Sequence, residues 1–132
     1  MSARILLALG VAGALSQCNT DILFCTDELL AIHITIVNQV GQPLDGLQVA
    51  DTVRRTGKVL DLSPAASRVV VPAKGGPAAV FSDNFLHEVR PGGDEVTVVV
   101  SAGGHSTSGV FQFGSNGCHV EKVAGPDSLI IS

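Results

Sequence analysis

The sequence is short of several features that would each indicate a class of protein. It has no tryptophan and no tyrosine, and its only aromatic residues are five phenylalanines. Eight basic residues and a net charge of −4 argue against nucleic-acid binding, because proteins that bind nucleic acids usually carry a basic patch. Charged residues make up only 15% of the chain and hydrophobic residues 45%, which excludes a disordered tail and allows a buried core. A length of 132 residues suits one domain.

The chain also lacks an apolar run long enough to cross a bilayer comfortably as a helix. The apolar run at its start, Ile5–Leu15, has 11 residues, follows one positive charge at Arg4 and precedes small residues. This arrangement is typical of an export signal, so we expect residues 1–17 to be a signal peptide. A buried first helix or strand is the alternative, but no amphipathic pattern in the segment favours it.

The end of this leader also carries a short motif. Leu15-Ser16-Gln17-Cys18 resembles the box of bacterial lipoproteins, in which the cysteine is lipidated and becomes the first residue of the mature chain. Leu15 and Ser16 match, whereas Gln17 stands where that family has a small residue. The resemblance implies lipid attachment at Cys18, with residues 18–28 as a short tether. Cleavage after Ala14 or Ser16 is the alternative, and it would give a freely secreted protein.

Cysteine is scarce, with Cys18, Cys25 and Cys118 only. Exported proteins meet an oxidising compartment, where disulfides persist. Whether Cys18 carries lipid or leaves with the leader, Cys25 and Cys118 remain, so we expect them to form a disulfide. The pair Cys118-His119 allows two alternative interpretations, in which it forms part of a metal site or provides a cysteine nucleophile. Both are weaker, because the four histidines are scattered singly and adjacent residues on a strand point to opposite faces.

From Leu29 onward the pattern is one of short strands and turns. Apolar residues alternate with polar ones, and glycine or proline turns separate the runs. The strongest run, Glu95–Ala102, places Val96, Val98 and Val100 on one face. We expect one helical turn at residues 84–89 and strands at residues 29–38, 47–55, 67–73, 78–83, 95–102, 108–115, 119–123 and 127–132. About seven or eight such strands favour an all-β, antiparallel sandwich.

Gly41-Gln-Pro-Leu-Asp-Gly-Leu-Gln-Val49 resembles the G-x-P-L-x-G-x-x-V stretch of carboxypeptidase regulatory-like domains. Val-Thr-Val-Val-Val-Ser-Ala-Gly-Gly-His-Ser, residues 96–106, is similar to a strand of that family ending in a glycine turn. The closing stretch from Gly117 to Asp127 looks like the end of small exported bacterial proteins with this domain. The resemblance implies a transthyretin-like, prealbumin-type Greek-key sandwich over residues 29–132. It is less clear over residues 58–90.

This resemblance implies a non-enzymatic accessory or structural module with no cofactor. We therefore expect an exported protein of the periplasm or outer surface, anchored to a membrane only through Cys18, which binds a protein or polysaccharide of the cell envelope. One alternative is a copper or zinc protein that uses His33 and His119. Another is a transthyretin-like hydrolase of a ureide, but that family's C-terminal Y-R-G-S motif is absent and the chain ends D-S-L-I-I-S. We nominate no catalytic residue.

Overall fold

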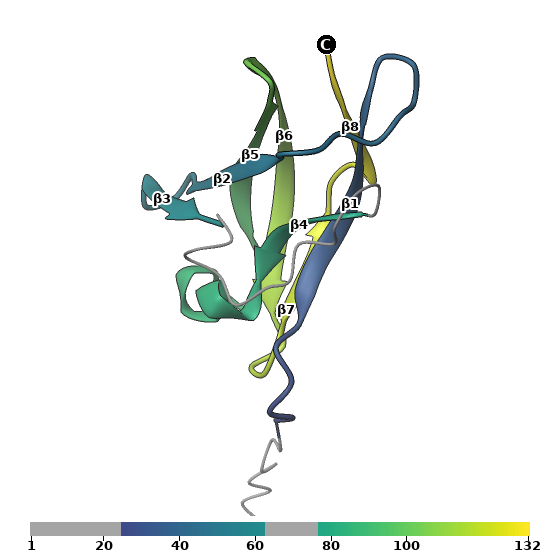
Figure 1. The fold of residues 1–132 in the computed structure, drawn as a ribbon. Coiled ribbons are helices and arrows are strands. Elements are labelled where there is room, and N and C mark those ends of the chain that lie inside the picture. Colours follow the sequence, from purple (N-terminus) through teal and green to yellow (C-terminus); the bar gives the residue numbers. More distant parts are fainter. Residues whose placement is uncertain (1–24, 63–76) are drawn as a thin grey trace, which may run out of the picture.

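Short runs of alternating apolar residues build nearly all the regular structure of this chain. Figure 1 shows a computed structural model, which describes residues 25–62 and 77–132. The expected strand at residues 67–73 and the leader lie outside the described residues. Eight strands and one 3₁₀ helix occur in the described part: β1 (Ala31–Asn38), β2 (Gln48–Val53), β3 (Lys58–Asp61), β4 (Ala78–Ser82), η1 (Asp83–Glu88), β5 (Asp94–Ala102), β6 (His105–Ser115), β7 (Val120–Ala124) and β8 (Ser128–Ile131).

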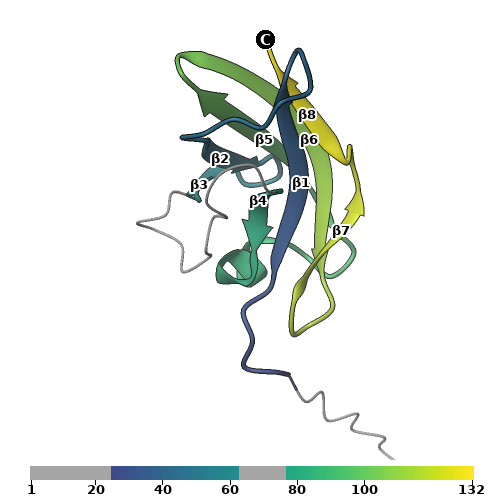
Figure 2. The same cartoon turned by 45° about the vertical axis from the view of Figure 1, so that its right-hand side comes forward.

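The strands form two sheets that pack as a β-sandwich, as the strand pattern predicted (Figures 1 and 2). One sheet has the order β4-β1-β8 and the other has the order β3-β2-β5-β6-β7. The prediction of a purely antiparallel sandwich is wrong in one place, because β1 and β8 run parallel. A parallel pair needs a long crossover connection, and here the whole five-stranded sheet lies between the two strands in the sequence.

The core lies between the sheets, and valine is its commonest residue. Val96, Val98 and Val100 of β5 are fully buried, as their spacing predicted, because alternate residues of a strand face the same side. Ile34 and Ile36 of β1 face them from the smaller sheet and are almost fully buried. Burial of each such side chain contributes roughly 1.5–3 kcal/mol, so these alternating runs supply much of the driving force for folding.

Three phenylalanines join the two sheets across the core. Phe81 of β4 stacks on Phe113 of β6, with ring centroids 4.6 Å apart. Phe113 in turn stacks on Phe111, at 5.3 Å. All three side chains are at most 1% exposed. Aromatic pairs of this kind add to the free energy of burial, so this stack helps to hold the two sheets together.

One local element differs from the sequence-based expectation and another agrees with it. The strand β3 was not expected, because its four residues contain only one side chain, Leu60, that enters the core. It forms by pairing with β2 across a tight turn in which Gly57 has φ of +70°. The helical turn expected at residues 84–89 is present as η1, Asp83–Glu88.

Buried Asp94 fixes the turn between β2 and β3 against the start of β5. Its carboxylate accepts two hydrogen bonds from the Arg55 guanidinium, both at 3.0 Å, and further bonds from the backbone and side chain of Arg90. The hydrogen bonds from Arg55 are the main reason why the pKa of Asp94 falls to about 2. Because both carboxylate oxygens of Asp94 accept hydrogen bonds from Arg55 and Arg90, we assign this buried charge a structural role.

A second buried carboxyl, Asp51 of β2, has no such partner. Its side chain is fully buried, and neither oxygen forms a hydrogen bond. Directly opposite it on the two neighbouring strands stand Leu60 and Val98, both core residues. This apolar burial raises the pKa of Asp51 to about 8, so the carboxyl is mostly protonated at neutral pH.

The two ends of the sandwich differ in what they carry. The described chain begins at the lower end in Figures 1 and 2, close to the turn between β6 and β7. The loop between β1 and β2, the β5–β6 hairpin and the end of β8 gather at the opposite, upper end. We call the lower end, which carries Cys25 and the turn between β6 and β7, the tether pole, after the tether expected at residues 18–28. The upper end is the free pole.

Candidate functional site

The expected pair of cysteines lies at the tether pole. Cys25 precedes β1, Cys118 lies in the turn between β6 and β7, and the structure joins them in a disulfide with their Cα atoms 5.2 Å apart. The bond spans 93 positions of the sequence and fixes the start of the described chain to the five-stranded sheet. Cys18, the expected lipid attachment site, lies outside the described residues.

The two histidines considered as metal ligands are used separately. His33 is exposed on β1, and its Nδ1 lies 3.1 Å from the carbonyl oxygen of Ala31. His119 bonds instead to Asp83 and Thr26 through its two ring nitrogens. Residues 25–62 and 77–132 contain no group of three or more histidine, cysteine, aspartate or glutamate side chains that is suited to hold a metal ion.

Asp83 organises the polar contacts of the tether pole. Its Oδ2 lies 2.6 Å from Nδ1 of His119 and accepts the backbone N–H of Leu30 at 2.8 Å. Its Oδ1 accepts the backbone N–H of Val120 at 2.7 Å. Burial alone would raise the pKa of Asp83, but the hydrogen bonds from His119, Leu30 and Val120 together lower it. The result is a fixed carboxylate that connects the segment before β1 to the start of β7.

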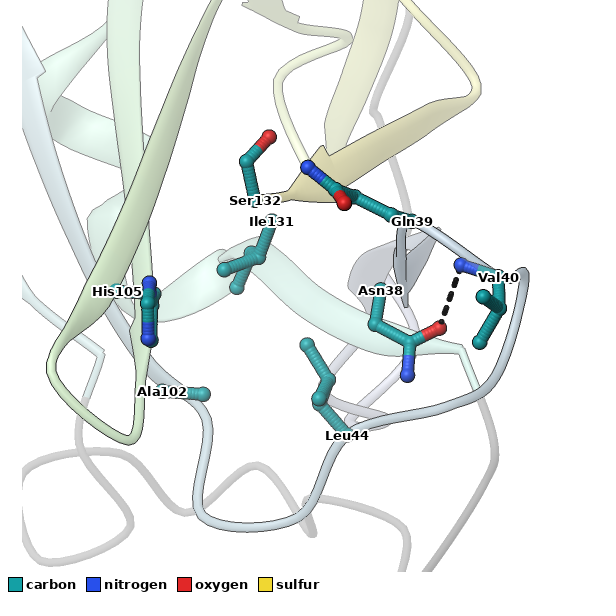
Figure 3. Close-up of a pocket in the computed structure, with 8 residues that line it drawn as sticks. All are labelled: Asn38, Gln39, Val40, Leu44, Ala102, His105, Ile131 and Ser132. Atoms are coloured by element: carbon teal, nitrogen blue, oxygen red, sulfur yellow. Dashed lines mark hydrogen bonds between the residues drawn. The ribbon is translucent and has the colours of Figure 1, made fainter.

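The free pole carries a hollow with a mostly apolar lining. Its volume is about 320 Å³, which is at the lower end of the range for small-ligand sites. Figure 3 shows the side chains of Leu44, Ala102 and Ile131 pointing into it from three separate segments. Five further residues complete the lining: Asn38, Gln39, Val40, His105 and Ser132.

One wall of this hollow is a loop that its own hydrogen bonds hold in shape. The side chain of Asn38 accepts the backbone N–H groups of Val40 and Gln42, at 3.1 and 2.9 Å (Figure 3 shows the first). Gly41 sits between them with φ of +80°, a conformation that favours glycine. These hydrogen bonds hold the loop in one conformation, and Val40 at its rim is 76% exposed. A loop that is already ordered costs little entropy when it forms a contact.

Sequence reasoning missed both the hollow and the Asp83 contacts. The hollow depends on three chain segments that meet only in the folded sheets, and its apolar residues belong to ordinary strand and turn patterns. Asp83 and His119 are 36 positions apart, and neither stands in a motif that indicates the other. The resemblance did mark residues 41–49, but as a structural stretch and not as the wall of a hollow.

No protein-family model, curated protein sequence or solved structure matches this chain. None of the helices in the described ranges is long and apolar enough to span a membrane. The candidate site therefore rests on the geometry of the free pole alone.

Proposed function

We propose that this chain is a non-enzymatic binding module of the bacterial cell envelope, held at its tether pole and binding a partner at its free pole. The observation that carries the proposal is the separation of the two poles. The disulfide of Cys25 and Cys118 fixes the tether pole. The apolar hollow is lined by the loop between β1 and β2, the β5–β6 hairpin and the end of β8, which lie at the other end of the sandwich (Figures 1 and 2). A module held in this way presents its hollow away from the point of attachment.

Export and attachment are supported by the leader and by the disulfide. A signal peptide over residues 1–17 would deliver the chain to an oxidising compartment, where a disulfide of this kind persists. Lipid at Cys18 would hold the module on a membrane, with residues 18–28 as the tether. Without lipid, the same module would be secreted.

The sandwich fits the proposed kinship with carboxypeptidase regulatory-like domains, which belong to the transthyretin-like Greek-key folds. The stretch Gly41–Val49, which carries the resemblance, includes Leu44 of the hollow. A binding role at this loop agrees with the accessory role that the family implies. Loops held on a rigid sandwich are also where binding residues commonly lie.

The lining of the hollow favours a protein partner over a polysaccharide. Leu44, Ala102 and Ile131 offer aliphatic contacts, whereas the many hydroxyls of a sugar would lose water without finding enough hydrogen-bond partners. An apolar side chain of the partner would fill the hollow, and the amides of Asn38 and Gln39 at the rim suit the polar backbone on either side of it.

The test is a titration of the folded domain with N-acetyl-leucine amide, followed by methyl NMR. We expect saturable shifts at the methyl groups of Leu44 and Ile131, and no such shifts with N-acetylglucosamine. Leu44→Gln should abolish the response, whereas Val59→Gln, an exposed valine on the distant strand β3, should retain it. A response that survives in folded Leu44→Gln, or shifts confined to other parts of the sandwich, would refute binding at the hollow.

A further inference from the structure

Three side chains at the tether pole are arranged as a nucleophile, a base and an orienting carboxylate. Thr26 Oγ1 lies 3.0 Å from Nε2 of His119, and Nδ1 of His119 lies 2.6 Å from Oδ2 of Asp83. These spacings are the ones at which a histidine takes a proton from a hydroxyl while a third group holds its ring. The arrangement is separate from the hollow, which lies at the other pole.

The hydrogen bonds also fix which ring nitrogen carries a proton. A carboxylate only accepts, so Nδ1 of His119 must donate to Asp83. In the neutral imidazole, Nε2 then has its lone pair free to accept the hydroxyl proton of Thr26. Asp83 cannot turn away from the ring, because the backbone N–H groups of Leu30 and Val120 hold both its oxygens.

The three side chains become less exposed from the hydroxyl to the base to the carboxylate. Thr26 is exposed, the side chain of His119 is 15% exposed, and that of Asp83 is 6% exposed. A reagent in solution therefore meets the hydroxyl first, while the base and the carboxylate stay shielded from water behind it. Hydrogen bonds to a carboxylate are stronger in such shielded surroundings, which favours a fixed ring orientation.

The disulfide brings the hydroxyl and its base together. Thr26 directly follows Cys25, and His119 directly follows Cys118. The disulfide between the two cysteines therefore brings the threonine and the histidine close together. The side chain of Asn116 fixes the backbone on the histidine side, since it accepts the N–H groups of Cys118 and His119 at 3.0 and 2.8 Å. The disulfide therefore helps to hold the two segments that carry Thr26 and His119 next to each other.

We propose that Thr26 is an acyl-acceptor site, activated by His119 and Asp83 and assembled by the disulfide, that becomes esterified by an activated ester. In the first step, Oγ1 of Thr26 attacks the carbonyl carbon and its proton passes to Nε2 of His119. The tetrahedral adduct then collapses, the bond to the leaving oxygen breaks, and Nε2 returns the proton to that oxygen. Thr26 ends as an ester, the donor leaves as an alcohol or phenol, and nothing is oxidised or reduced.

The experiment treats the folded, disulfide-bonded protein with p-nitrophenyl acetate, quenches it with acid and maps acetyl groups by peptide mass spectrometry. We expect Thr26 to be acetylated about 10²-fold faster than Thr56. Thr56 is an exposed threonine whose hydroxyl accepts the backbone N–H of Lys58 and has no histidine partner among the described residues. His119→Gln and Asp83→Asn should each bring the rate at Thr26 close to that at Thr56. Circular dichroism would establish that each variant is folded before it is compared.

A purely structural contact between Thr26 and His119 predicts a different outcome. Thr26 would then react no faster than Thr56, and either that result or an unchanged rate in folded His119→Gln overturns the proposal. The double variant Cys25→Ser, Cys118→Ser tests the role of the disulfide, and its acetylation at Thr26 should fall at least tenfold. An undiminished rate in this double variant would overturn assembly by the disulfide.

Discussion

Replacing Asp51 by asparagine should remove much of the pH dependence of this domain's stability between pH 5 and pH 8. The carboxyl is fully buried between Leu60 and Val98, without a hydrogen bond, and its pKa in the fold is about 8. In the unfolded chain an aspartate titrates near its ordinary pKa of about 3.9. Between these two values the folded protein therefore holds one proton more than the unfolded chain.

The sign and size of the effect follow from this difference. Because the folded state binds the extra proton, the free energy of unfolding falls as pH rises, by up to about 1.4 kcal/mol per pH unit. From pH 5 to pH 8 the loss due to Asp51 amounts to roughly 3.5 kcal/mol. A domain of this size has a total stability on the order of 5–15 kcal/mol, so the loss is large enough to measure.

The assay is urea unfolding at pH 5, 6, 7 and 8, followed by far-ultraviolet circular dichroism because the chain has no tryptophan or tyrosine. The four histidines also titrate in this range, so the quantity to examine is the difference between wild type and Asp51→Asn. As pH rises, the free energy of unfolding of the wild type should fall relative to that of Asp51→Asn. If both proteins lose stability in parallel, Asp51 is not a buried neutral carboxyl and the reasoning fails.

Three further predictions concern the disulfide, the core and the leader. Cys25→Ser and Cys118→Ser should each lower the free energy of unfolding by a similar amount, roughly 2–5 kcal/mol, and the double variant should cost little more than either; additive losses in denaturant titrations would contradict a shared bond. Val98→Asp should be far more destabilising than Thr97→Asp, because Val98 is fully buried and Thr97 is only partly so; equal shifts in thermal midpoint would show that the faces of β5 are misassigned. Cys18→Ala should release the protein from membranes or block its processing without changing the fold; a wild-type protein that partitions into the aqueous phase of a detergent extraction would exclude the lipid anchor.

Local alternation made much of the fold predictable. Alternate valines of β5 (Val96, Val98 and Val100) and two isoleucines of β1 (Ile34 and Ile36) occupy the core face that their spacing indicates. The same rule also places Asp51 in the core, because it stands between Val49 and Val53 on one face of β2. The alternation therefore indicated that Asp51 is buried. We did not predict this burial from the sequence, because burying an unpaired charge is ordinarily costly.

The pairing of distant segments was not predictable from the sequence. Alternation indicates which face of a strand is buried but does not say which strand lies beside it, so the parallel pairing of β1 with β8 came only from the structure. For the same reason, the sequence did not predict the contact of Asp83 with His119 or the position of Leu44 in the lining of the hollow. The cysteine pair was the exception, because the count of cysteines left few partners to choose from.

The pairing of β1 with β8 also determines when this domain can fold. Val37 lies beside Ile130, so one side of the first strand stays unpaired until the last strand has been synthesised. Contacts of such long sequence separation form slowly, since the intervening chain must first be ordered. A nascent chain would therefore remain open until residues 128–131 leave the ribosome. Such a delay would suit the export that we propose, in which the chain would cross a membrane unfolded before its sheets and its disulfide form.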